Sequence, residues 1–432
     1  MKKLTKAFTP PRVIALGFAL TILVGSGLLM LPGCVRPGVS LRYIVALYTA
    51  SSAVCVTGLI TVDPADTFTG VGQAILGLLI QIGGLGVATM GAGIMLAMGR
   101  RMDLRSRNIV REAVNAASGQ GIVSLVRGIF LTTAVIETAG ALLSLPSFLR
   151  DHSFGRAVGI SLFHAVASFN NAGFDILGGG TSLIPYREDV LLNLVTCGMI
   201  VLGGIGFPVL RELRRKRLRW RKLSMHARVV LSVSAVLTVG GMLLLKLTES
   251  MSWMGALFHS VSARTAGFST YAMGGFTQPG LLVMLFLMLI GASPGSTGGG
   301  VKTTTLFVLW QGVRSAATNR SERAFRYAVP RTAFRKAAVI LLLALGVIFT
   351  GTYLLILLEP TVSLRDALFE ITSAFATVGL STGITAGLGT GAKLLSVLIM
   401  YIGRLGPLTV ATLWYFSRGE RVRFPQGDIA IG

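Results

Sequence analysis

Four short segments of this 432-residue sequence combine a glycine with small, polar or short apolar residues just before it. Each segment follows a short apolar run and precedes a long one, which is the order expected of a loop that enters a membrane and returns. The segments are residues 53–59, 169–175, 264–269 and 376–381. Rings of backbone carbonyl oxygens in such loops can replace the water shell of a cation. We therefore predict that four similar loops bind a dehydrated monovalent cation around one pore.

The predicted ligands are the carbonyl oxygens of each glycine and of the two residues before it, and we call these four tripeptides the glycine loops. They are Val56, Thr57 and Gly58; Asn171, Ala172 and Gly173; Thr265, Ala266 and Gly267; and Thr377, Val378 and Gly379. The alternative, that they are ordinary turns without an ion, is less favoured because four copies recur in the same setting.

The elements that position these loops are expected to be transmembrane helices. The chain is 52% hydrophobic and 13% charged, with a mean hydropathy of +0.72, which excludes an ordinary soluble protein. Since about 20 apolar residues span a bilayer, we predict an all-α integral membrane protein with eight transmembrane helices. Four stretches are uninterrupted and four are apolar but interrupted by glycine: 13–31, 122–149, 229–247 and 337–358, then 68–98, 190–210, 281–313 and 394–416.

The net charge of +23 gathers between these stretches. Residues 100–111, 211–228 and 314–336 are strongly basic, and cationic loops stay on the cytoplasmic side. Both termini and all three linkers are therefore expected to be cytoplasmic, and the first apolar stretch is expected to remain as a helix. Residues 214–222 are basic enough to bind anionic membrane lipid or an acidic partner. Nucleic acid is not predicted, because no groove-reading motif accompanies the charge.

Four repeats of apolar helix, half-length segment, glycine loop and second helix account for the chain. We call them units 1 to 4, at 12–112, 113–222, 223–331 and 332–418, followed by a cytoplasmic tail at 419–432. The half-length segments rise only ~1.5 Å per residue and cannot cross a hydrocarbon core of ~30 Å. We expect them to re-enter from outside around a pore, since irregular backbone at membrane depth must be buried or line water. They are residues 43–54, 157–169, 254–263 and 364–375.

Each second helix carries a small-residue motif, at 82–86, 202–208, 290–294 and 402–407. Close helix packing is the expected explanation of its glycines. Arg404 lies within such a motif at mid-span, where insertion costs about 2.5 to 3.5 kcal/mol unless the side chain has water or a partner. An ion pair inside the bundle and a place on the ion path both remain open for Arg404.

Unit 3 is expected to contain a break, because residues 278–312 would extend roughly 50 Å as one helix. The predicted loop covers 291–303, with Lys302 on it or below it. A nucleotide-binding P-loop is disfavoured here, since Val301 separates Gly300 from Lys302 and no β-strand is expected before it.

Taken together, the four glycine loops, the repeated units and the break in unit 3 resemble the Trk/Ktr/HKT superfamily of potassium transporters. The length resembles the bacterial KtrB-like membrane subunits most closely, and the resemblance covers about residues 12–418. It implies potassium uptake, with K+ held at the carbonyls of the glycine loops, which act as selectivity filters. Some family members that favour sodium carry serine at the position of Gly58, so potassium is favoured over a sodium-permeable transporter or channel.

The resemblance also implies a gate formed by an intramembrane loop below the filters, with Arg404 beside it. The gate residues are Gly295, Ser296, Thr297, Gly298, Gly299, Gly300, Lys302 and Arg404. A homodimer in the bacterial cytoplasmic membrane is implied, with a cytosolic nucleotide-binding KtrA-like ring docked on linkers 214–222 and 314–335. The chain itself has no dinucleotide-binding module. We expect no covalently bound cofactor and no enzymatic activity, and sodium stays open as a coupling ion.

Other polar residues carry weaker expectations. Asp175 would attract cations at the outer mouth or cap a helix. Arg264 would support its glycine loop from behind, with Glu370 as one candidate partner. Both His164 and His259 would be packed donors rather than metal ligands. Glu137 would be paired inside the bundle, with a proton or sodium role left open.

Overall fold

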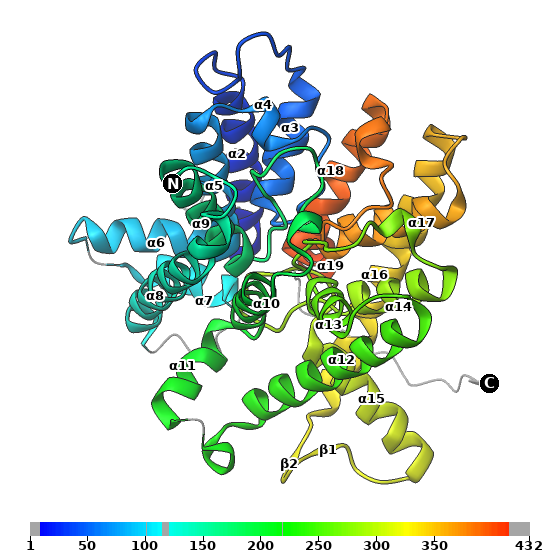
Figure 1. The fold of residues 1–432 in the computed structure, drawn as a ribbon. Coiled ribbons are helices and arrows are strands. Elements are labelled where there is room, and N and C mark those ends of the chain that lie inside the picture. The colour runs from blue at the N-terminus through cyan, green and yellow to red at the C-terminus, as the bar shows by residue number, and fades with distance from the viewer. Residues whose placement is uncertain (1–8, 101, 115–120, 218, 414–432) are drawn as a thin grey trace.

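The computed structural model describes residues 9–100, 102–114, 121–217 and 219–413, and helices make up most of this part of the chain (Figure 1). The predicted tail at 419–432 lies outside the described residues. Four described helices are long and apolar enough to cross a membrane, or six if two bent pairs each count as one span. The four are α2 (Pro10–Leu29), α8 (Ile122–Phe148), α12 (Met225–Thr248) and α16 (Arg331–Leu358).

The half-length helices are confirmed as helices, one in each unit. They are α3 (Tyr43–Val54), α9 (Phe154–Phe169), α13 (Trp253–Ser262) and α17 (Leu364–Ala376). Two of them begin at a serine N-cap, because Ser252 accepts a hydrogen bond from Gly255 N and Ser363 from Asp366 N. In each unit no more than two residues separate the end of this helix from the glycine loop, so the helix ends fix where the loops begin.

Every second helix is broken, and the breaks were only partly predicted. In units 1, 2 and 4 one helix ends and another begins within one or two residues: α5 (Gly70–Leu85) and α6 (Val87–Ala97), α10 (Val190–Gly204) and α11 (Phe207–Lys216), and α18 (Thr390–Leu405) and α19 (Pro407–Thr412). The first two pairs bend by 101°. Gly86, Gly206 and Gly406 have φ of 84°, 91° and 88°, a region that favours glycine. Helix packing alone is therefore the wrong explanation for these three glycines.

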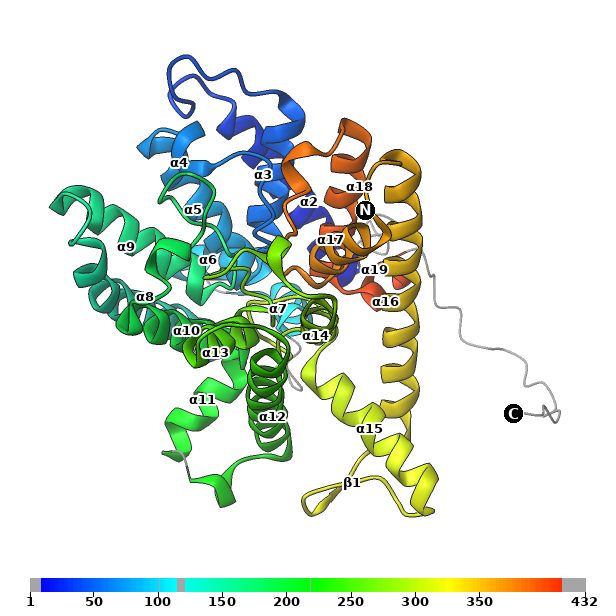
Figure 2. The same cartoon turned by 45° about the vertical axis from the view of Figure 1, so that its right-hand side comes forward.

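The break predicted in unit 3 is confirmed, and it is much longer than the breaks in the other three units. The helix α14 (Gln278–Leu289) ends well before α15 (Thr303–Thr318), and we call residues 290–302 between them the unit 3 loop. A parallel bridge between Ile290 and Val301 closes its base. No strand precedes the loop in the described chain, which agrees with the rejection of a P-loop. The helix α15 then runs between α12 and α16, which it contacts (Figure 2).

The units follow one another around a closed ring. Each half-length helix packs on the first helix of its own unit and on the second helix of the unit before it. The contacts between units are α5 with α9, α10 with α13, α14 with α17, and α18 with α3. Because unit 4 contacts unit 1, the four glycine loops must face a common centre.

The remaining elements are short and connect these helices. They are α4 (Pro64–Thr67), α7 (Leu104–Ala113), η1 (Ile184–Tyr186), η2 (Trp220–Lys222), η3 (Met273–Gly275), η4 (Thr385–Gly387) and a hairpin of β1 (Arg323–Ala324) and β2 (Tyr327–Ala328). In Figures 1 and 2 the hairpin and α11 lie at the same end of the molecule, which carries the basic linkers between units 2 and 3 and between units 3 and 4.

Candidate functional site

The four glycine loops meet in a ring. A Cβ added to any of the four glycines would collide with the carbonyl oxygen of the residue that precedes the glycine of the next unit. The collisions run from Gly58 to Ala172, from Gly173 to Ala266, from Gly267 to Val378 and from Gly379 back to Thr57. Only glycine fits at these positions, because the backbone of the neighbouring loop occupies the space of a side chain. In all four units the predicted glycine and the residue before it are thus brought together.

The four loops also share an unusual backbone. The glycines have φ of 90°, 66°, 80° and 98° in chain order. The residue two positions earlier is in the same region although it carries a Cβ: Val56 at 57°, Asn171 at 58°, Thr265 at 89° and Thr377 at 52°. Such conformations cost of order 1–3 kcal/mol for ordinary residues and persist only where the surroundings impose them. Because these conformations recur at the same position in all four units, we infer that each loop needs them to point its backbone carbonyls in a particular direction.

Each half-length helix holds its loop through hydrogen bonds from the loop back to the helix. Thr57 N donates to Ser52 O at 2.7 Å, and Val378 N donates to Ser373 O at 2.9 Å. The hydroxyls of the same two serines accept hydrogen bonds from Gly58 N and Gly379 N, each at 3.0 Å. This role of the two serines was not predicted, although each stands six residues before its ring glycine in the sequence.

Units 2 and 3 use the same helix end in a different way. Ala172 N donates to Ala167 O at 2.8 Å without a side-chain partner of the serine kind. In unit 3, Gly267 N donates to Ser262 O at 3.3 Å, and Ser262 Oγ donates to Phe268 O at 2.5 Å. The backbone support is therefore common to the units, whereas the side-chain support differs between them.

One cavity of about 430 Å³ has all four ring glycines in its wall. Asp63 and Asp175 line the same cavity, so its mouth is acidic. Asp175 does not cap a helix; its Oδ1 accepts a hydrogen bond from Leu177 N at 3.1 Å within the loop after the ring, outside the spanning helices. Burial raises the pKa of Asp175 to about 6, and Asp63 acts in the same direction. The arrangement suits attraction of a cation toward the ring.

The unit 3 loop lies against the glycine loops of units 3 and 4. Gly298 and Gly299 are buried, and a Cβ on either would collide with the hydroxyl of Thr265 or Thr377, respectively. Gly299 N donates to Thr377 Oγ1 at 3.0 Å. Thr265 Oγ1 lies 3.1 Å from the side-chain amide of Asn171, so the inner ends of three loops are joined. The glycines of the unit 3 loop thus permit contact that larger residues would prevent.

Unit 2 holds the other side of the unit 3 loop. Phe207 N donates to Gly295 O at 2.9 Å, beside the break at Gly206. Ser293 N donates to Gly204 O at 2.9 Å, and Thr297 Oγ1 donates to Phe169 O at 3.3 Å. The loop therefore bridges the second helix of unit 2 and the glycine loop of unit 4.

Arg404 reaches this loop from unit 4, as predicted, and its partners are carbonyls. Its guanidinium donates to Thr297 O in the loop, and to Gly83 O and Gly84 O in unit 1, the last at 3.1 Å. Arg404 takes part in none of the ion pairs formed among the described residues, so an ion pair inside the bundle is the wrong explanation for it. Lys302 Nζ folds back onto the loop and donates to Gly298 O at 2.7 Å and Gly299 O at 3.3 Å. Both cations line a second cavity, of about 170 Å³, together with Gly295, Ser296 and Gly300.

The earlier glycines of the second-helix motifs do serve close packing. A Cβ on Gly83, Gly203 or Gly403 would collide with the carbonyl oxygen of a residue at the end of a half-length helix. The residues hit are Val54, Phe169 and Phe375. Packing is thus confirmed for the first glycines of these motifs, and the helix ends that position the ring rest on them.

The remaining predicted residues fall into place around the ring. His164 Nε2 lies 2.8 Å from Thr196 Oγ1, and His259 Nε2 lies 3.4 Å from Thr270 Oγ1, which confirms packed histidines. Glu137 is paired as expected: its carboxylate accepts hydrogen bonds from Asn170 at 3.1 Å and from Gln81 at 3.4 Å.

Glu370 is not the partner of Arg264, which is a correction to the prediction. Arg264 Nη1 donates to Ser234 O at 3.4 Å, on the first helix of its own unit. Glu370 instead accepts hydrogen bonds from two hydroxyls of its own unit, Ser381 and Thr385. The two side chains belong to neighbouring units and each finds a partner within its own.

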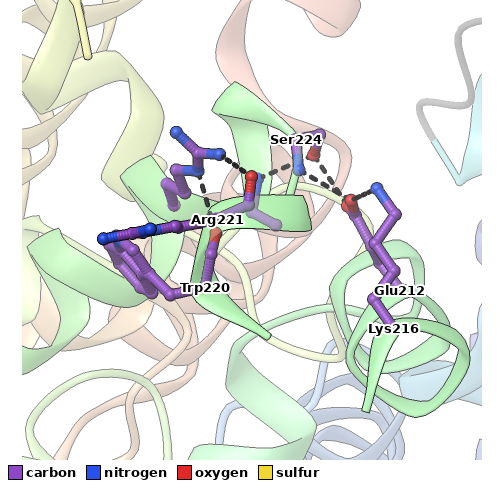
Figure 3. A network of polar contacts seen from close by, with 7 residues as sticks. Glu212, Lys216, Trp220, Arg221 and Ser224 are labelled. Atoms are coloured by element: carbon purple, nitrogen blue, oxygen red, sulfur yellow. Dashed lines mark hydrogen bonds and ion pairs between the residues drawn. The ribbon is translucent and has the colours of Figure 1, made fainter. Parts of the chain in front are cut away.

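The basic linker between α11 and α12 is held in a defined turn (Figure 3). Glu212 accepts hydrogen bonds from the backbone and the hydroxyl of Ser224, each at 2.7 Å, and pairs with Lys216 at 2.5 Å. Arg228 donates to the carbonyls of Trp220 and Arg221 at 3.2 and 2.6 Å. The turn leaves a cluster of cations exposed: Arg214, Arg215, Arg217, Arg219, Arg221 and Lys222.

The basic linker between units 2 and 3 (residues 211–228, linker 2–3) also contacts the basic linker between units 3 and 4 (residues 314–336, linker 3–4). The Trp220 ring lies edge-on to Phe325 in the β1–β2 hairpin, with centroids 6.1 Å apart. The Arg228 guanidinium lies over the same Phe325 ring at 5.6 Å. The two predicted docking segments therefore lie next to each other.

Comparison with known proteins gives concordant matches. The TrkH family model, described as a cation transport protein, matches residues 21–224 and 221–418. Ktr system potassium uptake protein B of Bacillus subtilis is 36% identical over 98% of this chain and 97% of its own length. Potassium/sodium uptake protein NtpJ of Enterococcus hirae is 34% identical over 100% and 99%. The crystal structure of the potassium transporter TrkH from Vibrio parahaemolyticus has a TM-score of 0.73 and 18% identity, covering 93% of this chain and 85% of that chain.

Proposed function

This chain belongs to the TrkH family of cation transport proteins, and from that premise we propose that it is the pore-forming subunit of a Ktr-type potassium uptake system. It is a multi-pass membrane protein, and we place it in a bacterial cytoplasmic membrane with both termini inside. The observation that carries the proposal is the closed ring of four glycine loops, each packed against the carbonyl of the next. The names of two relatives, both of which include potassium uptake, support the choice of ion.

In this proposal K+ loses its water shell between the four glycine loops. The ligands are the carbonyl oxygens of the twelve predicted residues, and the shared positive-φ backbone directs them toward the ring centre. The acidic cavity outside the ring concentrates cations before they enter. Eight transmembrane helices, four of them the broken second helices, enclose this path with the half-length helices re-entering from outside.

The unit 3 loop acts as the gate in this account. It is buried directly against the glycine loops of units 3 and 4, so an ion leaving the ring inward meets it first. Arg404 and Lys302 donate to its carbonyls and add positive charge there, which opposes leakage of cations. Opening would require the loop to leave the hydroxyl of Thr377 and the carbonyls of unit 2.

We also propose a homodimer whose cytosolic face docks a separate nucleotide-binding regulatory subunit of the KtrA-like kind. The words "Ktr system" in the name of the Bacillus subtilis relative support a system of several components. The adjoining basic linkers 2–3 and 3–4 are the proposed contact. Replacing Arg219 and Arg221 with glutamate should weaken capture of such a subunit and leave ion selectivity unchanged.

A sodium-permeable transporter of the same family is the second candidate, because NtpJ is named for both potassium and sodium. The identity of residue 58 separates the two. A Cβ on Gly58 would lie 2.5 Å from Ala172 O and so displace one carbonyl of the ring. We predict that Gly58→Ser weakens discrimination against sodium, and unchanged relative uptake of the two ions would count against this assignment.

The test of the proposed function is rubidium uptake into vesicles that contain the purified protein, with potassium and sodium as competitors. Potassium should compete strongly and sodium weakly. Restored growth of a potassium-uptake-deficient host at low potassium should accompany this result. Equal competition by sodium and potassium would favour the second candidate. Absence of rubidium uptake into the vesicles would refute both candidates.

A further inference from the structure

A buried carboxylate stands behind the glycine loop of unit 4, at a position where the other units have no acid. Glu370 lies nine residues before Gly379, and Thr49 and His164 have the same spacing from Gly58 and Gly173. His259 takes this place in unit 3, one residue closer to its glycine. All four side chains are buried, but only Glu370 brings a carboxylate to the ring.

Glu370 is bound by hydroxyls and by no cation. Its side chain has no exposed surface, and it takes part in none of the ion pairs formed among the described residues. Ser381 Oγ donates to Glu370 Oε2 at 2.7 Å, and Thr385 Oγ1 lies 2.6 Å from Glu370 Oε1. A buried carboxylate without such donors would strongly destabilise the fold. The two hydrogen bonds therefore restrain the Ser381 and Thr385 side chains as well as Glu370.

The two hydroxyls belong to the segment that leaves the ring. Ser381 follows Gly379 by two residues, Thr385 begins η4, and both line the outer cavity. Their hydroxyls also lie 2.9 Å from each other. Glu370 therefore fastens the chain immediately outside the fourth glycine loop to the half-length helix behind it.

The other units have weaker fastenings at this position. His259 reaches Thr270 at 3.4 Å, and His164 binds Thr196 on the second helix rather than the segment after its loop. Thr49 Oγ1 has no hydrogen-bond partner among the described residues. The glycine loop of unit 4 is also the one that binds the unit 3 loop at its inner end, through Thr377. It is thus held at both ends.

We propose that Glu370 is a positioning residue that sets the affinity and selectivity of the ring for its ion. It acts through Ser381 and Thr385, which it holds so that the carbonyls of Val378 and Gly379 keep their direction when the unit 3 loop moves. The proposal rests on the proposed function, since it assumes that the ring binds the transported cation.

The test compares rubidium uptake by the wild-type protein and by Glu370→Gln, Ser381→Ala and Thr385→Val, with KM, maximal rate and sodium competition measured for each. Glutamine keeps the shape but replaces one acceptor oxygen with an amide donor. Glu370→Gln should raise KM about tenfold, as expected for loss of one hydrogen bond, and should weaken discrimination against sodium. The maximal rate should change less. Thr49→Val is the matched control and should behave as wild type.

A double variant shows whether the hydroxyls act through the acid. If they do, Glu370→Gln combined with Thr385→Val should be no worse than Glu370→Gln alone, because both remove the same contact. Fully additive effects would overturn the proposal, as would a Glu370→Gln protein with wild-type KM and sodium discrimination. Should Glu370→Gln not fold, Ser381→Ala and Thr385→Val decide the matter: raised KM in both supports the proposal, and wild-type values in both overturn it. A wild-type protein that moves no cation would refute the proposed function and this inference with it.

Discussion

The ring of glycine loops is built alike in all four units, whereas the breaks in the second helices are built alike in three units and differently in the fourth. Every ring glycine meets the carbonyl of the next loop, and every loop has the same two positive-φ positions. Beneath the ring, Gly86, Gly206 and Gly406 turn the chain at one residue, while unit 3 has the loop 290–302. A site that surrounds an ion needs similar carbonyl ligands from all four units. A barrier across the ion path can be formed by a single unit whose second helix differs from the other three.

The largest expected effect is on the ring itself. Gly267→Ala should reduce uptake by more than about tenfold, because left-handed backbone costs ~1–2 kcal/mol for a residue with a Cβ and each 1.4 kcal/mol is tenfold. The added methyl would also meet Val378 O, which is backbone and cannot rotate away. Rubidium uptake measures the loss, and Gly379→Ala should match it. Gly198→Ala is the control, since nothing lies within 4 Å of its Cβ position. Wild-type uptake with alanine at the ring glycine of one unit would show that the four units do not contribute equally to the ring.

A smaller and opposite effect is expected in the unit 3 loop. Gly299→Ala would push the loop from Thr377 and weaken the hydrogen bond from Gly299 N. Loss of about 1 kcal/mol favours the displaced loop by roughly fivefold, so resting flux should rise. Gly128→Ala, with open space around its Cβ position, should leave the flux unchanged. Reduced flux in Gly299→Ala would show that the loop supports the ring rather than closes it.

Arg404→Ala should raise the resting flux by a factor comparable to or smaller than that expected for Gly299→Ala. Its guanidinium joins the unit 3 loop to the second helix of unit 1, so Arg404→Ala removes both the donors and the charge. We expect a resting flux raised about two- to fivefold, which corresponds to a net loss of ~0.4–1 kcal/mol, about the contribution of one typical hydrogen bond. Arg404→Lys should be intermediate, because an ammonium group cannot reach both sets of carbonyls as a planar guanidinium does. Wild-type kinetics in Arg404→Ala would remove this residue from the gate.

The smallest effect is expected at the outer mouth. Since the pKa of Asp175 is raised to about 6, its carboxylate is charged at pH 7.5 and largely neutral at pH 5. The half-saturating potassium concentration should rise by up to about fivefold as pH falls over this range, as one charge near water is worth ~1 kcal/mol. Asp175→Asn should abolish this dependence and show the weaker affinity at both pH values. A pH response that survives in Asp175→Asn would exclude Asp175 as its source.

The repeated parts of the molecule could be read from the sequence because glycine spacing and apolar length carry them directly. The half-length helices and the break in unit 3 follow from segment length and from residues that cannot continue a helix. The bends at Gly86, Gly206 and Gly406 could not be read in this way, since a glycine that packs and a glycine that bends look the same in a sequence. Gly83 and Gly86 belong to one motif and have different roles.

Side-chain partners were the least predictable part. Glu370 and Arg264 flank different glycine loops, and a plain pairing of opposite charges suggested a bond between them. In the structure each side chain binds a partner in its own unit. The two half-length helices stand behind different glycine loops. Arg404 likewise binds carbonyls, whose availability depends on breaks in other units that the sequence of its own helix does not reveal.

The most direct test of the ring is a crystal structure of the protein grown with rubidium, in which anomalous scattering locates the ion. The account predicts rubidium peaks at the centre of the four glycine loops, surrounded by the carbonyls of Thr57, Ala172, Ala266 and Val378. Replacing rubidium with sodium should remove or weaken those peaks. Rubidium bound only elsewhere, with none among these carbonyls, would contradict the account.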